Sequence, residues 1–377
     1  MLFTADSFAQ QAAGTKAKLS SSSLQLQWNK TGKGWQLQQL MLKQAGKWTA
    51  LPGVSGEYMF LYSPAKPDTV PAKVYDEKGK LIDIPEAQYR YILPPWKHTL
   101  LPAALNTAGE AIRFFPSVVK QHSNELQFTQ EIDKASIAAT WRMDPAFDGD
   151  ILVELELLAK EDGYFSLSSP VLATVEKKDL KWAMVPGHFQ GSSIEKNLVK
   201  AYGYGQGIPA LPVVTRERTA STLSPLVSNK SGVTMAVIPA PGTSRDPWES
   251  DHSTQNTWQL GLSVMNRDAQ LTPVAWHPIL GEKGSWLKRG EKVIFSFRYT
   301  VKAADWFSVY KHAANDIYRL QDFLALKQTK QSLTSRIQNM HKYVIDDSTS
   351  KWRTEDYRGL KIGAQDYRGG VYGGDGD

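Results

Sequence analysis

The chain has 377 residues, of which 41% are apolar and 22% charged, and its 44 lysines and arginines exceed its 38 acidic residues by six. This length suits two or three domains with a large buried core. The lack of cysteine excludes disulfides, thiolate metal sites and a cysteine nucleophile. The sequence contains no arginine-rich cluster and no apolar stretch of membrane-spanning length, so we expect neither nucleic-acid binding nor a membrane span.

The N-terminus carries features of a targeting segment. Ser7-Phe8-Ala9-Gln10-Gln11 resembles the end of a bacterial signal peptide, with small residues near the cleavage position. Only Met1-Leu2-Phe3 remains of an apolar region before it. We therefore interpret residues 1–15 as a signal-peptide remnant or a disordered leader, which predicts a secreted or periplasmic protein.

Alternating apolar residues predict strands along most of the chain. Leu24, Leu26 and Trp28 alternate with polar residues, and residues 29–34 turn the chain into Trp35, which predicts a β-hairpin. Further strands are predicted at residues 57–62, 88–93, 151–158, 258–265 and 293–301. Because no helical pattern separates these strands, we expect large antiparallel sheets packed face to face.

The hydrophobic period changes after residue 302. A first helix is predicted by apolar residues at steps of four and three, namely Trp306, Tyr310, Ala313, Ile317, Leu320 and Leu324. A second helix follows, with Thr329 as its expected N-cap and an apolar stripe of Leu333, Ile337, Met340 and Val344. The two stripes either pack on the sheets or begin a further helical domain.

Residues 182–248 are rich in glycine, proline and aromatic side chains. Loops of this composition shape a binding surface at the edge of a sheet, or else they are ordinary long connections. Aromatic side chains stack on sugar rings, and guanidinium groups hydrogen-bond hydroxyls or a uronate. The candidate substrate-binding residues are therefore Trp182, His188, Phe189, Tyr202, Tyr204, Arg216, Arg245 and Trp248.

The sequence assigns no catalytic residue, metal site or cofactor. The segment Gly203–Gly207 lacks the lysine of a phosphate-binding loop and is followed by Pro209, where a helix would have to begin. The seven histidines show no metal-ligand spacing. Sugar hydrolysis usually needs two carboxylates, but the acids of the Asp246–Asp251 loop have no separation fixed by their spacing.

The order of elements resembles a known architecture. The segments that carry this likeness are Val293–Val301, Ala303–Tyr310, Ser350–Arg353 and Ile362–Gly370. They resemble secreted carbohydrate-active enzymes in which a galactose-mutarotase-like β-supersandwich precedes an (α/α)6 toroid of the six-hairpin glycosidase type. The resemblance implies a mainly β protein, with a large antiparallel β-supersandwich at 16–302, an α-helical linker hairpin at 303–347 and the start of a truncated helical domain at 348–377.

The resemblance also implies a function. In it the chain is the N-terminal, carbohydrate-binding and substrate-shaping portion of a bacterial polysaccharide-degrading glycoside hydrolase. Its catalytic domain would then lie largely beyond this sequence, and the chain alone would be inactive. Two alternatives stay open: a polysaccharide lyase of the same architecture, and a non-catalytic carbohydrate-binding protein. In each case the expected partner is a polysaccharide or oligosaccharide.

Overall fold

A computed structural model describes residues 14–67, 109–187, 189–195, 206–209, 214–216, 222–243, 259–282, 284–322, 331–345 and 352–365. The chain divides into two compact units, Met1–Tyr318 and Arg319–Asp377. The described part is mainly β, with large antiparallel sheets and a short C-terminal helical part, which confirms the predicted fold class. The first helix of the expected linker belongs to the first unit.

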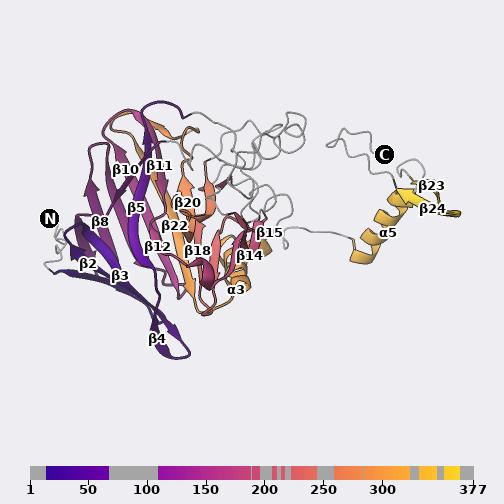
Figure 1. The fold of residues 1–377 in the computed structure, drawn as a ribbon, viewed down its shortest axis with the longest axis horizontal. Coiled ribbons are helices and arrows are strands. Elements are labelled where there is room, and N and C mark those ends of the chain that lie inside the picture. The colour runs from indigo at the N-terminus through magenta and orange to yellow at the C-terminus, as the bar shows by residue number, and fades with distance from the viewer. Residues whose placement is uncertain are drawn as a thin grey trace, which may run out of the picture. The chain divides into compact units, whose positions relative to one another are not determined.

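Three sheets make up the first unit (Figure 1). The four-stranded sheet contains, in spatial order, β1 (Lys16–Ser20), β2 (Leu24–Thr31), β3 (Gly34–Gln44) and β4 (Lys47–Ala50). The ten-stranded sheet contains β15 (Gln206–Pro209), β14 (Phe189–Glu195), β13 (Leu180–Val185), β17 (Leu226–Asn229), β18 (Thr234–Pro239), β22 (Lys292–Lys302), β10 (Asp150–Ala159), β9 (Ala135–Met143), β8 (Glu125–Glu131) and β7 (Val118–His122).

The candidate site lies on the eight-stranded sheet. Its main order is β12 (Val171–Ala173), β5 (Val54–Ser63), β11 (Gly163–Ser168), β20 (Leu271–His277), β19 (Gly261–Met265) and β16 (Thr215–Arg216). Two further strands lie beside this path, β6 (Glu110–Phe114) on β5 and β21 (Trp286–Leu287) on β11. The described pairings are antiparallel except for β14 with β15, which is parallel.

Apolar side chains at every second position place one face of each of the longest strands in the core. In β22 the side chains of Phe295, Phe297 and Tyr299 are buried on one face, as the sequence predicts. Opposite them on β10 lie Leu155, Val153 and Ile151, which are also buried. The two strands therefore contribute one continuous apolar surface to the core between the sheets.

An aromatic cluster joins all three sheets. Trp141 of β9 meets Trp28 of β2 edge-on at 5.5 Å and stacks on Tyr299 of β22 at 5.5 Å between ring centroids. Its Nε1 donates a 2.7 Å hydrogen bond to Oη of Tyr58, on β5. Because each indole buries a large apolar area, these rings account for much of the cohesion between the sheets.

A helical segment covers the outer face of the ten-stranded sheet. Helix α3 (Trp306–His312) begins after Asp305, whose Oδ1 accepts a 2.8 Å hydrogen bond from the backbone N–H of Ser308. It continues as a π-helix, η3 (Ala313–Ile317). The buried side chains that it packs against the sheet are Val309, Ala313 and Ile317 from the helix and Met184, Leu226, Ala236 and Ile238 from the strands.

The predicted helix is correct in its first part and is interrupted at Arg319, after which residues 320–322 are helical again and Leu324 lies outside the described residues. Trp306, Tyr310, Ala313 and Ile317 pack in the cluster on the ten-stranded sheet. The π-helix ends there, and Arg319 follows with a φ of 52°, a left-handed conformation that ends a helical run. A short 3-10 helix, η1 (Lys177–Asp179), is the other helical turn described in this unit.

The second unit contains helix α5 (Leu333–Ile345) and a hairpin of β23 (Trp352–Tyr357) and β24 (Leu360–Gln365). The helix begins three residues later than expected, because Ser332 is its cap and accepts a 3.1 Å hydrogen bond from the Ser335 N–H. Thr329 lies outside the described residues.

Residues 352–365 form strands where the approach to a helical domain was expected. The turn explains the difference. Arg358 and Gly359 have φ values of 52° and 81°. Two successive positive φ values match the twist of a two-residue hairpin and do not fit a helix. The assignment of residues 348–377 to the start of a helical domain stays a prediction.

Candidate functional site

The outer face of the eight-stranded sheet brings together residues from distant parts of the sequence. Ser168 of β11 lies opposite Trp276 of β20, which lies opposite Gly261 of β19. Gly261 in turn pairs with Arg216 of β16. Directly opposed residues of antiparallel strands share a face, so these positions form one row across the sheet.

An apolar cluster occupies the same face. It consists of the buried residues Met59, Leu61, Val214, Val274, Trp276, Ile279 and Leu280. Met59 and Leu61 alternate along β5 with Tyr58 and Phe60, which point into the core between the sheets. We call this surface, together with Ser166 and Ser168, the outer sheet face. Figure 1 shows its strands β5, β11 and β20, which are neighbours in the sheet.

Two polar atoms on the outer sheet face have no hydrogen-bond partner among the described residues. They are Oγ of Ser166 and Nε1 of Trp276, both buried. Ser166 pairs with Leu61, and it lies diagonally across from Trp276 on the neighbouring strand. A buried polar atom that lacks a partner costs about 1–3 kcal/mol. A hydroxyl and an indole N–H beside apolar side chains can therefore serve a ligand that is itself polar and apolar.

Charged residues lie at one end of this face. Arg113 of β6 donates two hydrogen bonds to the carboxylate of Asp268, both at 2.7 Å, and lies 3.1 Å from Oε2 of Glu57. The hydrogen bond to Asp268 is the main cause that raises the pKa of Arg113. Burial lowers the pKa of the neighbouring Arg267, and the charge of Arg113 lowers it further. Two guanidinium groups therefore lie close together here.

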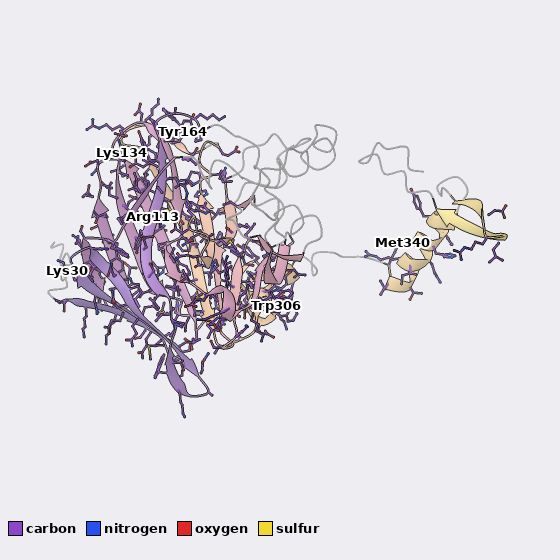
Figure 2. All side chains as sticks on the ribbon, viewed as in Figure 1. Lys30, Arg113, Lys134, Tyr164, Trp306 and Met340 are labelled. Carbon is purple, nitrogen blue, oxygen red and sulfur yellow. The ribbon has the colours of Figure 1, made fainter. Side chains whose placement is uncertain are left out.

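Aromatic residues lie toward the other end. Tyr164 of β11 meets Trp286 of β21 edge-on, with 4.8 Å between the ring centroids, and Trp286 is 42% exposed. Tyr164 pairs with Ser63 of β5, whereas Arg113 pairs with Met59. The two β5 residues, Ser63 and Met59, are four positions apart in that strand. Tyr164 and Arg113, both labelled in Figure 2, are therefore separated by the same four positions along the direction of β5.

His277, next to Trp276 in the sequence, faces the opposite way. Its ring lies 5.4 Å from that of Phe295, in the core between the sheets. Its Nδ1 lies 3.0 Å from the carbonyl oxygen of Gln259, which can only accept, so Nδ1 carries the proton. Burial lowers the pKa of His277, which favours the neutral ring. His277 is a structural donor here.

The residues predicted from the sequence are described only in part. Trp182, on β13, stacks on Trp306 of helix α3 at 5.4 Å, so it lies on the ten-stranded sheet and away from Trp276. Phe189 and Arg216 belong to β14 and β16 through their backbones. The remaining candidates lie outside the described residues, namely His188, Tyr202, Tyr204, Arg245 and Trp248.

A buried charged network was not predicted from the sequence. Asp150 accepts hydrogen bonds from Oγ1 of Thr300 at 2.8 Å and Nη1 of Arg298 at 3.2 Å. Nε2 of His312 lies 2.9 Å from Oδ2 of Asp150, and Nδ1 of His312 lies 2.7 Å from Oδ2 of Asp316. The Asp150 and His312 side chains are 0% and 5% exposed. The network therefore fixes helix α3 on the sheet.

Part of this network could have been found from the sequence. His312 and Asp316 are four residues apart, a spacing that places them side by side on a helix. Their link to Asp150 could not, since 162 residues separate it from His312. Within the described ranges, no group of three or more histidine, cysteine or acidic side chains is placed to hold a metal ion. No helix there is long and apolar enough to cross a membrane.

Several solved structures are similar to this chain. A GalM/aldose epimerase homologue from C. elegans is 10% identical, with a TM-score of 0.38, over 77% of this chain and 99% of that one. The α-N-acetylgalactosaminidase NagBb from Bifidobacterium bifidum is 12% identical, with a TM-score of 0.36, over 80% and 39%. The GH36 α-galactosidase AgaA from Geobacillus stearothermophilus is 10% identical, with a TM-score of 0.34, over 76% and 40%. No protein-family model and no curated protein matches the sequence.

Proposed function

We propose that the first unit is a carbohydrate-binding β-sandwich that binds its sugar at the outer sheet face. The observation that carries this proposal is the pair of buried polar atoms, Oγ of Ser166 and Nε1 of Trp276, beside an apolar cluster. A sugar ring has apolar C–H faces and hydroxyl groups around its edge. Such a ring matches a site that offers an indole, a hydroxyl and aliphatic side chains together. Because Ser166 and Trp276 are 0% and 1% exposed, the sugar has to enter the interior of the fold to reach them.

The flanking residues support the same class of ligand. Arg113 with its partners Asp268 and Glu57 places charged groups at one end of the face, and Tyr164 with Trp286 offers aromatic surface at the other. Arginine forms directed hydrogen bonds to hydroxyl and carboxylate oxygens. An extended glycan has complementary partners at both ends of such a surface.

We also propose a role for the first unit within a larger protein. We infer a substrate-shaping portion of a polysaccharide-degrading glycoside hydrolase, active outside the cytoplasm. Two other roles would use the same site: a polysaccharide lyase, and a non-catalytic sugar-binding protein. Reducing-end release by the full chain supports a hydrolase, and a product that absorbs in the near ultraviolet supports a lyase. Binding without either product supports a binding protein or a portion that needs a further catalytic domain.

Calorimetric titration of the full chain with a panel of neutral oligosaccharides, namely malto-, xylo-, manno- and galacto-oligosaccharides, tests the site. Trp276→Phe deletes the Nε1–H and keeps a ring. We expect about a tenfold loss of affinity for the panel member that binds, because one buried hydrogen bond is worth about 1–2 kcal/mol. Ser166→Ala is the second variant. It removes a hydroxyl that lacks a described partner, so we expect weaker binding with unchanged or higher thermal stability.

Trp182→Phe is the matched control. Nε1 of Trp182 is also buried without a partner among the described residues, but it lies under helix α3. The proposal expects normal sugar affinity in Trp182→Phe. If Trp182→Phe loses affinity and Trp276→Phe does not, the sugar binds at Trp182 on the ten-stranded sheet, as the sequence predicts, and not at the outer sheet face. Absence of binding to every sugar of the panel would contradict the proposed function.

A further inference from the structure

The positive charge of the chain is concentrated near its N-terminus. Residues 7–56 contain no aspartate, glutamate or arginine, and they contain six lysines, namely Lys16, Lys18, Lys30, Lys33, Lys43 and Lys47. The whole chain has 44 basic and 38 acidic residues, so removing these six lysines leaves 38 of each. The formal net charge of +6 is therefore that of this segment. The lysines are spread along the segment and form no run in the sequence.

The fold gathers this segment into one sheet. Residues 16–50 form β1 to β4, whose inner face is buried against the core. The opposite face carries lysine and amide side chains, namely Lys16, Lys18, Gln25, Gln27, Asn29, Gln36, Gln38 and Gln39. We call this surface the amide face. It is separate from the outer sheet face, which lies on β5, β11 and β20.

Strand register arranges the amide face in rows. Lys16 lies opposite Asn29, which lies opposite Gln36. Lys18 lies opposite Gln27, which lies opposite Gln39 in the same way. Each row thus runs from an ammonium group through two amides across three strands. Neighbouring strands are about 4.8 Å apart, so the rows present closely spaced donors and acceptors.

A β-bulge enlarges the amide face. The register between β2 and β3 shifts between Gln27 and Trp28, and both Gln38 and Gln39 are exposed although they are adjacent in the sequence. Hydrogen bonds along the strands orient the amides. Nε2 of Gln27 donates to Oδ1 of Asn29 at 3.1 Å, and Nε2 of Gln38 donates to Oε1 of Gln36 at 3.2 Å.

The margins of the face add charge and one aromatic ring. Lys43 of β3 pairs with Trp48 of β4, whose side chain is 37% exposed. Lys30, labelled in Figure 2, lies at the end of β2 beside the β2–β3 turn. The carboxylate of Asp148 comes near the β1–β2 turn, where the hydroxyls of Ser21 and Ser22 bind it at 2.5 Å. None of the lysines of the amide face forms an ion pair with a described residue.

We propose that the amide face binds an acidic polysaccharide, as a second surface beyond the sugar site proposed above. The lysines complement its carboxylate or sulfate groups, and the amide rows complement its hydroxyls, since amides both donate and accept. Nucleic acid fits less well, because the face has no arginine, and Trp48 at its margin is its one exposed ring for stacking bases. The absence of an exposed apolar wedge on β1 to β3 also disfavours insertion into a membrane.

Affinity electrophoresis of the full chain in gels that contain polygalacturonate, heparin or dextran tests the proposal. We expect retardation by an anionic polymer and none by dextran. Polygalacturonate separates carboxylate recognition from the sulfate recognition that heparin probes. The triple variant Lys16→Gln, Lys18→Gln and Lys43→Gln removes charge at exposed positions, and we expect about a tenfold weaker affinity, because each exposed ionic contact contributes up to about 1 kcal/mol.

A second triple variant with the same change in net charge is the control. Lys120→Gln, Lys177→Gln and Lys311→Gln together change the net charge equally at exposed positions outside the first fifty residues. This control should keep the affinity of the parent protein. Equal losses in both triple variants, or no retardation by either anionic polymer, would overturn the proposal. So would duplex DNA that binds as tightly as the polysaccharide, since the surface would then be a general polyanion binder. Trp276→Phe should leave this binding unchanged, which keeps the two sites distinguishable.

Discussion

Arg113 and Asp268 form a two-point ion pair although 155 residues separate them in the sequence. Both N–H groups of the guanidinium fork lie 2.7 Å from a carboxylate oxygen of Asp268. Arg113 lies on β6, whereas Asp268 lies in the turn between β19 and β20, which is not a neighbour of β6 in the sheet. The pair therefore ties a turn back to a distant strand at one end of the outer sheet face.

A double-mutant cycle with Arg113→Gln and Asp268→Asn measures this tie, and Arg113→Lys tests the contribution of the two-point geometry. The side chains are 33% and 47% exposed, so solvent screens the pair, and we expect a coupling free energy of about 0.5–1 kcal/mol in urea unfolding. Lysine keeps the charge but cannot form the two-point contact. The cycle on Lys178 and Glu176, a pair that is far more exposed, is the comparison and should give a coupling near zero. Equal coupling in both cycles would contradict a special role for the two-point geometry.

Replacement of Asp150 should destabilise the protein much more. Asp150→Asn removes the charge that Arg298 and His312 share in the buried network. Breaking a buried ion pair usually costs about 3–5 kcal/mol, and we expect the lower end of this range because Arg298 keeps a 2.7 Å ion pair with Asp144. Urea unfolding measures the total loss, and hydrogen exchange should show opening of helix α3 first. Asp316→Asn is the control, and its half-exposed side chain should make the loss much smaller.

The sequence was sufficient for the elements that have one clear period. Phe295, Phe297 and Tyr299 alternate strictly, and their strand lies in the core as predicted. The spacing of Trp306, Tyr310 and Ile317 likewise predicted the helical face that packs on the sheet. In both cases a single buried face leaves its period in the sequence.

The outer sheet face could not be predicted from the sequence because its strands are buried on both sides. Met59 and Leu61 are as apolar as Tyr58 and Phe60 beside them, so no alternation separates the two faces of β5. The pairing of Trp276 with Ser168 joins strands more than a hundred residues apart. Local sequence carries no information about such a pairing, and the polar atoms on this face were missed for that reason.

The hydrogen bond between Trp141 and Tyr58 connects the two largest sheets, and its removal should be costly. Tyr58→Phe keeps the ring but leaves Nε1 of Trp141 without its acceptor. Burial raises the pKa of Tyr58, with the bond to Trp141 acting in the opposite direction, so the hydroxyl is neutral in the folded protein. We expect a loss of about 1–3 kcal/mol in the free energy of unfolding, the usual cost of an unsatisfied buried donor. Tyr310→Phe, at a partly exposed position of α3, removes a hydroxyl that has no hydrogen-bond partner among the described residues and should cause a much smaller loss.

The buried ring of His277 should make the stability depend on pH below neutrality. Its pKa in the folded state is lowered, chiefly by burial, although the hydrogen bond to Gln259 opposes this shift. The unfolded chain, in which histidine has a pKa of about 6.5, therefore binds protons first as the pH falls. Its contribution to stability is complete above about pH 6.5 and is lost progressively as the pH drops toward the lower folded-state pKa.

His277→Asn provides the comparison, because asparagine can still donate toward the Gln259 carbonyl and does not titrate. We expect the variant to be less stable than the parent at pH 7.5, since the shorter side chain leaves part of the site beside Phe295 unfilled. The gap between the two proteins should narrow at pH 5, because only the parent loses stability from this ring. Unfolding by urea at both pH values measures the gap, and a gap that stays constant or widens at pH 5 would contradict the burial argument.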